Sequence, residues 1–99
     1  MKEFRLLNSD DGIIVEEVES KQCKYCSSAF IYKDANGWYH LIDRETGLDI
    51  CKSRQLMMLE QLFKNKKHQY EFHKKTETYN IKRERFEKLK LVHNAKGNY

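Results

Sequence analysis

The chain has 99 residues, of which 39% are hydrophobic, 34% charged and 12% aromatic, and its formal net charge is +4. This length predicts one small domain spanning residues 1–99, with little room for the large buried pocket of an enzyme. No apolar run approaches the roughly 20 residues of a membrane span, and the first residues lack the apolar stretch of a signal peptide. We therefore expect a cytoplasmic protein with no membrane partner.

The charge divides the chain at Cys51. Residues 1–51 hold six Lys and Arg against ten Asp and Glu, whereas residues 52–99 hold thirteen against five. This asymmetry predicts two surfaces that have different partners or that attract each other. A basic part favours nucleic acid, an acidic protein surface or an anionic membrane, and a solvated surface without a partner is the alternative.

The acidic part, residues 1–51, has the pattern of two β-hairpins. Residues 2–7 place apolar side chains at strand spacing, residues 13–18 are β-branched, and the turn-forming residues 8–12 lie between them. These features predict a first hairpin.

The second hairpin has the stronger signal. Residues 29–33 and 38–43 are apolar and aromatic, and Asn36-Gly37 between them is the dipeptide that favours a tight two-residue turn. In that register Ala35 faces Trp38 and Lys33 faces His40. Residues 48–50 are a candidate extension of the sheet.

The basic part, residues 52–99, has helical periodicity. Ser53 is the predicted cap of a helix that begins at Arg54 and runs to about Lys67. Beyond it, Tyr70 and Phe72 alternate as in a strand, although their neighbours also permit continued helix. Residues 81–93 predict a second helix. The apolar faces that should pack on the sheet consist of Leu56, Leu59, Leu62, Phe63, Phe86 and Leu89. The predicted fold class is α+β, with two short antiparallel β-hairpins followed by a helical C-terminal half of two helices.

Three cysteines leave three interpretations open. Cys23 and Cys26 form a C-x-x-C motif, and Cys51 follows much later. Without a signal peptide a disulfide framework is disfavoured, and without a βαβ pattern so is redox catalysis. One structural zinc held by Cys23, Cys26 and Cys51 is one interpretation, with His93 or Asp49 as candidates for the fourth ligand. Ordinary reduced thiols are the alternative.

The hairpin register bears on the zinc interpretation. Continued along both strands, it places Cys51 opposite Gln22 and hence near Cys23. His40 would lie roughly 20 Å from Cys26, at about 3.3 Å per strand residue, and is therefore disfavoured as a ligand.

Motifs of catalysis are absent from the sequence. It has no phosphate-binding glycine loop, no H-E-x-x-H and no G-x-S-x-G. His40 is best explained as a half-buried strand histidine, and the acidic pairs Asp10–Asp11 and Glu16–Glu17 as solubilising groups. We therefore expect a protein that is not an enzyme and has no small-molecule substrate.

The basic residues around Tyr70 and along the second helix are the best candidate site. Cations can neutralise phosphates, and aromatic rings can stack on unpaired bases. On the second helix, Lys82, Arg83 and Arg85 are expected to lie apart from Phe86 and Leu89. Because lysines outnumber arginines fourteen to five, backbone contacts are expected rather than base recognition. The predicted nucleic-acid-binding residues are Lys64, Lys66, Lys67, Tyr70, Lys74, Lys75, Lys82, Arg83 and Arg85.

The predicted function is that of a small regulatory or adaptor module. It binds nucleic acid, or a complex that handles nucleic acid, through residues 64–90. The alternative is a protein-binding inhibitor, of the type found in viruses and mobile elements, that blocks a host enzyme. In that case the acidic hairpin or exposed aromatic residues would contact the target.

Overall fold

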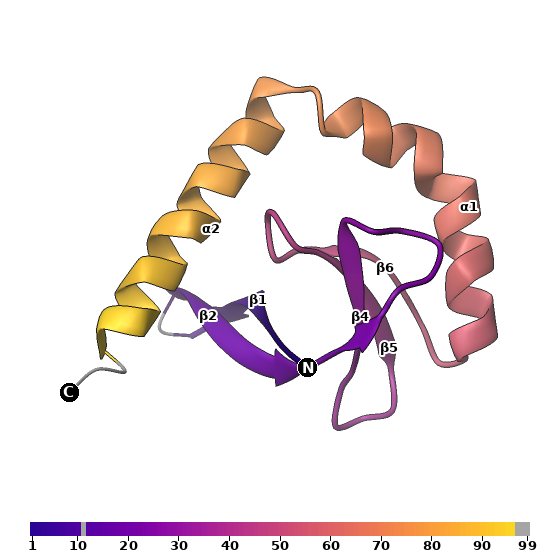
Figure 1. Ribbon diagram of the computed structural model, residues 1–99, viewed down its shortest axis with the longest axis horizontal. Helices are drawn as coiled ribbons and strands as arrows, with labels where there is room; N and C mark the ends of the chain where they lie inside the picture. Colours follow the sequence, from indigo (N-terminus) through magenta and orange to yellow (C-terminus); the bar gives the residue numbers. More distant parts are fainter. Residues whose placement is uncertain (11, 97–99) are drawn as a thin grey trace.

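The computed structural model describes residues 1–10 and 12–96, and within them six strands precede two helices (Figure 1). This arrangement confirms the predicted α+β class. The elements are β1 (Lys2–Ser9), β2 (Gly12–Glu19), β3 (Lys21–Gln22), β4 (Ala29–Lys33), β5 (Tyr39–Asp43), β6 (Asp49–Ser53), α1 (Leu56–His73) and α2 (Glu77–Lys96).

The first hairpin forms a sheet of its own. Strands β1 and β2 pair antiparallel from Lys2 opposite Glu19 to Ser9 opposite Gly12. The predicted hairpin is therefore confirmed, with strands that run slightly further than the sequence indicated. Asp10 lies in its turn, and Asp11 is outside the described residues.

The second sheet is antiparallel, in the order β3-β4-β5-β6. Lys33 pairs with Tyr39, so the predicted pairing of Lys33 with His40 is wrong by one residue. The Asp34 carboxylate causes this difference, because it accepts hydrogen bonds from the amides of Asn36 and Trp38, both at 2.9 Å. An Asp side chain that bonds the backbone in this way competes with the tighter two-residue turn.

Strand β6 also corrects an expected pairing. Cys51 lies opposite Leu41 on β5, and Gln22 pairs with Phe30 on β4. The prediction that Cys51 faces Gln22 is therefore wrong, because Cys51 belongs to a separate edge strand. Cys23 and Cys51 nevertheless belong to the same apolar cluster.

The helices are longer than their apolar periodicity indicated. Helix α1 begins at Leu56, and Gln55 stands at its N-cap without a side-chain cap. The predicted cap, Ser53, instead accepts a hydrogen bond from the Gln55 amide at 3.2 Å, just before the helix. Helix α2 begins earlier than expected, because the Thr76 hydroxyl accepts the Tyr79 amide at 3.2 Å, which is the geometry of an N-cap.

Apolar residues cover both faces of the four-stranded sheet. Leu59 and Phe63 of α1 pack with Ile31 and Leu41. Because side chains alternate along a strand, Phe30 and Ile42 point to the opposite face, where Val18 of β2 packs against them. The expected core position Leu56 is 42% exposed, since it lies at the very start of α1.

The helices form an arch around the sheets. Figure 1 shows α1 beside β6 and α2 beside the first hairpin, with the β5–β6 turn pointing into the arch between them. Phe86 of α2 is fully buried and would contact any side chain added at Gly47 in that turn. The arch therefore places side chains from α1, α2 and the β5–β6 hairpin around one space.

Candidate functional site

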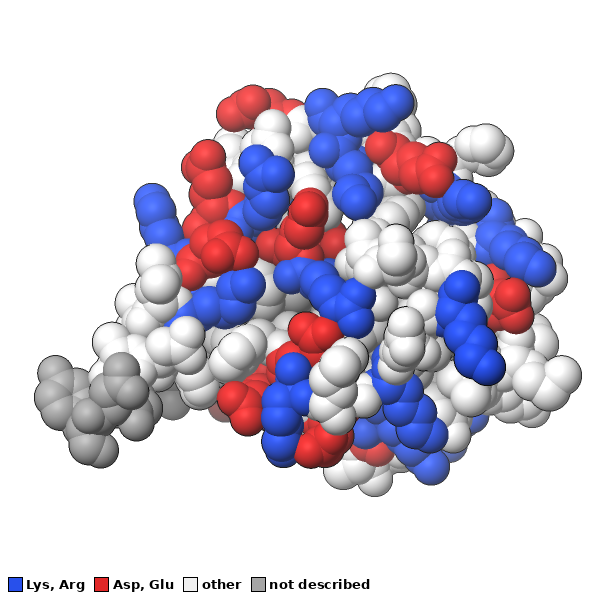
Figure 2. Space-filling model, viewed as in Figure 1, with Lys and Arg blue, Asp and Glu red and all other residues white. Residues whose placement is uncertain are grey.

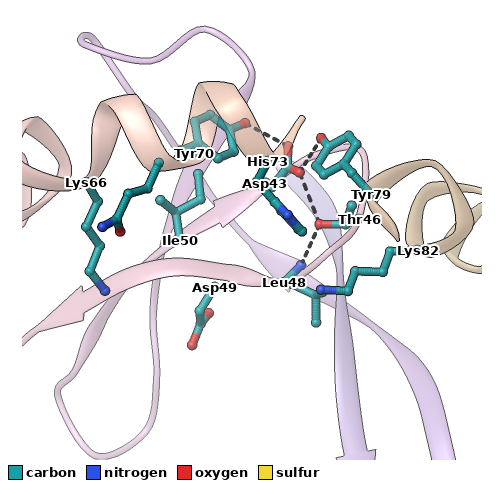
Figure 3. Close-up of a pocket in the computed structure, with 11 residues that line it drawn as sticks. Asp43, Thr46, Leu48, Asp49, Ile50, Lys66, Tyr70, His73, Tyr79 and Lys82 are labelled. Atoms are coloured by element: carbon teal, nitrogen blue, oxygen red, sulfur yellow. Dashed lines mark hydrogen bonds between the residues drawn. The ribbon is translucent and has the colours of Figure 1, made fainter. Parts of the chain in front are cut away.

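A pocket with a volume of 290 Å³ lies between the end of α1, the start of α2 and the β5–β6 hairpin. Figure 3 shows side chains from all three elements pointing into it. Its lining consists of Asp43, Thr46, Leu48, Asp49, Ile50, Lys66, Gln69, Tyr70, His73, Tyr79 and Lys82.

A buried carboxylate organises the inner wall of this pocket. Asp43, at the end of β5, is only 2% exposed. It accepts hydrogen bonds from the hydroxyls of Thr46 at 3.0 Å, Tyr70 at 3.0 Å and Tyr79. Burial raises the pKa of both tyrosines above the ordinary value, so their hydroxyls remain proton donors. Asp43 thus connects the sheet to both helices.

Two lysines stand on opposite sides of the pocket. Lys66 extends from α1 toward β6, and Lys82 extends from α2 toward Leu48 (Figure 3). Neither lysine forms an ion pair within the described part of the chain. The same lining also holds the carboxylates of Asp43 and Asp49, and the Asp49 carboxylate accepts a hydrogen bond from His40 at 3.0 Å.

The predicted nucleic-acid-binding residues do not form one surface. Those exposed to solvent are Lys64, Lys66, Lys67, Lys75, Arg83 and Arg85, and those half-buried are Tyr70, Lys74 and Lys82. In Figure 2 basic residues predominate over α1, whereas basic and acidic residues interleave over α2. The interleaving includes an ion pair between Lys90 and Glu87 at 2.9 Å.

Lys82 lies on the packed side of α2. The expectation that it is separate from Phe86 is wrong, because residues three and four apart on a helix share a face. Lys82 therefore falls between Tyr79 and Phe86, and it lines the pocket. Arg83 and Arg85 face solvent, as expected.

The two aromatic residues of the basic segment are placed differently. The Tyr70 ring packs edge-on against Phe63 at 6.0 Å, and its hydroxyl also hydrogen-bonds Ser28 at 3.0 Å. Phe72, two residues further along α1, is 74% exposed. An unpaired base could therefore stack on Phe72 without disturbing the fold, whereas Tyr70 is held in the interior.

The three cysteines are free thiols at the sheet face that α1 covers. Cys23 and Cys51 are buried, and Cys26 lies at the margin of the same cluster. Burial raises the pKa of Cys23 and raises that of Cys51 to about 11. Reactive cysteines have lowered pKa values, so these environments are unlike a redox site.

Zinc coordination stays a prediction. Among the described residues no group of three or more His, Cys, Asp and Glu side chains is arranged to hold a metal. Both candidates for the fourth ligand make other contacts: Asp49 bonds His40, and the His93 ring packs edge-on against Phe4 at 5.3 Å.

His40 is more deeply buried than the sequence suggested. Its two ring nitrogens lie 2.8 Å from the Asp34 carboxylate and 3.0 Å from that of Asp49. The hydrogen bond with His40, together with the amides of Trp38 and Asn36, lowers the pKa of Asp34 to about 2. This arrangement links the β4–β5 loop to β6 through His40, which is the role of a structural residue.

Comparison with known proteins gives no independent guide to function. No family model, curated protein or solved structure matches the chain. Within the described residues, no helix has the length and apolar character needed to cross a membrane.

Proposed function

We propose that the protein is a small, non-enzymatic module that binds single-stranded nucleic acid through the outer face of α1. The observation that carries this proposal is the exposed ring of Phe72 near the end of α1, with His68 one turn before it on the helix and Lys75 in the turn that follows the helix. Single strands offer both phosphates for cations and unpaired bases for aromatic rings. A duplex offers phosphates but no free base face.

Helical geometry aligns these groups. Lys64, His68 and Phe72 follow one another at a spacing of four residues, so they share one side of α1, and Lys75 lies in the turn just beyond its end. The 18 residues of α1 span about 27 Å at 1.5 Å per residue, which is long enough to contact several nucleotides. Lysines act as point charges here, which supports backbone contact without base recognition.

The acidic hairpin gives the inhibitor alternative less support than the basic residues give to nucleic-acid binding. Its carboxylates are partly neutralised within the chain: Glu19 pairs with Lys2 at 2.9 Å, Glu3 with Arg44 at 2.7 Å, and Glu16 lies 3.8 Å from Arg5. In contrast, Lys67 and Lys75 have no ion pair in the described part of the chain. The unneutralised charge available to a partner is therefore mainly positive.

A titration of labelled oligonucleotides followed by fluorescence anisotropy tests this function. We expect the single strand to bind more tightly than a duplex of the same sequence. The logarithm of the affinity should fall with the logarithm of salt concentration, with a slope of about −0.7 for each phosphate contact. If neither form binds, and a stoichiometric complex with a protein is recovered instead, the inhibitor alternative replaces this proposal.

Two variants localise the binding. Phe72→Ala should weaken single-strand binding by about 1–3 kcal/mol with little effect on duplex binding, because it removes only a stacking surface. Lys75→Glu should weaken both and lower the salt slope. Lys21→Glu, the same change at an exposed lysine of β3, is the matched control. Equal losses for Lys75→Glu and Lys21→Glu would show that net charge, and not α1, drives binding.

The proposed zinc ion and cytoplasmic location rest on the cysteines. Three free thiols are typical of a reducing compartment. If Cys23, Cys26 and Cys51 hold a structural zinc, protein purified without added metal contains one zinc per chain, and a chelator lowers its melting temperature. No zinc together with an unchanged melting temperature would leave three ordinary thiols.

A further inference from the structure

Three cations lie over aromatic rings at the end of the four-stranded sheet that carries the β4–β5 loop. The start of α1 lies at the same end of the molecule (Figure 1). Lys52 Nζ is 5.3 Å, and the guanidinium carbon of Arg54 4.8 Å, from the centre of the Trp38 ring. Lys33 Nζ is 5.4 Å from the centre of the Tyr39 ring. All three cations are exposed, and we call Trp38, Lys52 and Arg54 the Trp38 cluster.

Positive charge is in excess at this end of the sheet. None of the three cations forms an ion pair within the described part of the chain. The carboxylates of β6 and the β4–β5 loop are Asp49 and Asp34, and each lies within 3.0 Å of a ring nitrogen of His40. The bond with His40 and two backbone amides lower the pKa of Asp34. Three cations therefore stand against two carboxylates, even before His40 is counted.

Trp38 holds two of these cations close together. Because Lys52 and Arg54 lie over the same ring, their charges are within about 10 Å of each other. That distance is the length of about three stacked nucleotides, at 3.4 Å each along one strand. An exposed cation–π contact contributes only about 0.5–1 kcal/mol, so the ring positions the cations and leaves their charge available. One short stretch of a polyanion can therefore reach both.

An exposed stripe of α1 leads to the Trp38 cluster. Residues three and four apart share one side of a helix, so the stripe begins at Met57, three residues after Arg54, and ends at Phe72. All of its members are exposed: Met57, Gln61, Lys64, His68 and Phe72. The first turn of α1 holds no acidic residue, so the positive end of the helix dipole adds to the charge of Arg54.

We propose that the Trp38 cluster is a second phosphate-contacting site for the single strand that binds α1. The strand follows the stripe from Phe72 to Met57 and continues past the start of the helix, where Lys52 and Arg54 contact its phosphates. Trp38 positions both cations. This proposal rests on the proposed function and extends it from one contact site to two. The cluster residues are not among those that the sequence predicted to bind nucleic acid.

The two sites together define a strand length. At 3.4 Å for each stacked nucleotide, the 27 Å of α1 correspond to about eight nucleotides, and the cluster adds about three. A strand of 14 nucleotides therefore covers both sites, whereas one of 4 nucleotides is too short to reach from Phe72 to the cluster.

Fluorescence anisotropy with labelled oligodeoxyadenylates of 4 and 14 nucleotides tests this proposal. The double variant Lys52→Gln with Arg54→Gln should weaken binding of the longer strand about tenfold and that of the shorter strand less than about twofold. For the longer strand the slope of log affinity against log salt should decrease in magnitude by about 1.4, because two phosphate contacts are lost. The matched control, Lys21→Gln with Lys88→Gln, removes the same charge from exposed positions on β3 and α2 and should change neither affinity more than about twofold.

The emission of Trp38, the single tryptophan of the chain, shows whether the strand reaches the cluster. It should change when the longer strand binds and much less when the shorter one does. If the emission stays unchanged, or if both double variants lose affinity equally, the second site is overturned. The α1 surface then still stands if Phe72→Ala weakens both strands. If Phe72→Ala has no effect and the cluster variant alone loses affinity, the cluster binds the strand and the α1 surface is wrong. If neither strand binds, both proposals fail.

Discussion

At the scale of single residues, Asp43 connects the β5–β6 hairpin to α1 and α2. Its carboxylate accepts hydroxyl hydrogen bonds from α1, from α2 and from its own hairpin, and it is shielded from water. Hydrogen bonds to a charged group contribute about 1.5–3 kcal/mol each, and a buried donor left without an acceptor is costly. The position of both helix ends therefore depends on this one side chain.

Replacing Asp43 tests that dependence. Asp43→Asn removes the charge and puts an amide donor where hydroxyl donors already point, so at least one tyrosine loses its acceptor. We expect the free energy of unfolding, measured in urea, to fall by about 3 kcal/mol. Asp10→Asn, at an exposed turn position, should change it by less than about 0.5 kcal/mol. Equal effects of the two changes would show that the network does not stabilise the fold.

Asp34 makes the stability of the fold depend on pH in the acid range. Its pKa is lowered from 3.8 to about 2 in the folded chain, first by the hydrogen bond with His40. A carboxyl group with a lowered pKa stabilises the fold above its unfolded pKa, and this contribution is lost as pH falls toward the folded value. The window is therefore about pH 4 to pH 2.

The variant Asp34→Asn makes that window measurable. At neutral pH the natural chain should melt at a higher temperature than the variant. The gap between their melting temperatures should narrow as the pH falls from about 4 to about 2, because the natural carboxyl group becomes protonated. A gap that stays constant across this range would mean that the pairing of Asp34 with His40 contributes no pH dependence.

At the scale of elements, the sequence predicts the hairpins and helices better than their boundaries. Apolar periodicity located residues 29–33 correctly, but the β4–β5 register depended on the Asp34 side chain, which a turn dipeptide does not reveal. Likewise, Ser53 has the residue type of a helix cap, yet the N-cap of α1 is Gln55, and the Ser53 hydroxyl accepts the Gln55 amide before the helix begins. These choices depend on tertiary packing, because several residues of the right type compete for each role.

The β5–β6 turn is closely packed at Gly47. Gly47 has a φ of +70°, and a Cβ added there would lie 2.8 Å from the Leu6 amide nitrogen and 2.7 Å from Cζ of Phe86, and closer still to Cε1 of that ring. The Gly47 carbonyl also accepts the Leu6 amide at 2.8 Å. Because this hydrogen bond joins the turn to β1, the turn cannot move away from the added atom without breaking it.

Two alanine variants separate backbone strain from this close contact. Gly37→Ala, where φ is +87° and no atom lies near the added Cβ, should cost about 1 kcal/mol through strain alone. Gly47→Ala should cost at least about 2 kcal/mol more, because Leu6 and Phe86 must shift. Urea unfolding of both variants gives the difference. Equal losses would show that the turn relaxes freely.

At the scale of the whole molecule, the candidate site could be predicted only in part. Composition indicated a basic helical half, and α1 does present lysines to solvent. The pocket could not be predicted, because Asp43, Lys66 and Lys82 are separated in sequence and meet only when three elements pack together. The sequence also offers no sign that Phe72, and not Tyr70, is the exposed ring.

The packing of several elements around Phe86 predicts how the chain unfolds. The first hairpin, α2 and the four-stranded sheet meet where Phe86 is buried beside Gly47 and Leu6. If α2 were only loosely attached, it would melt first, and helix content would decrease before the sheet opens. Because Phe86 is buried beside Gly47, and Gly47 is hydrogen-bonded to Leu6 of the first hairpin, we expect one cooperative transition.

Urea unfolding followed by two probes tests this expectation. Far-ultraviolet circular dichroism reports mainly the helices, and fluorescence reports Trp38, the single tryptophan, in the β4–β5 loop. Both transitions should coincide in the natural chain. Phe86→Ala should lower the free energy of unfolding by about 3–5 kcal/mol and shift both midpoints together, since it leaves a cavity at the junction of α2 with the two sheets. A circular dichroism transition that precedes the Trp38 transition would instead show that α2 unfolds as an independent unit.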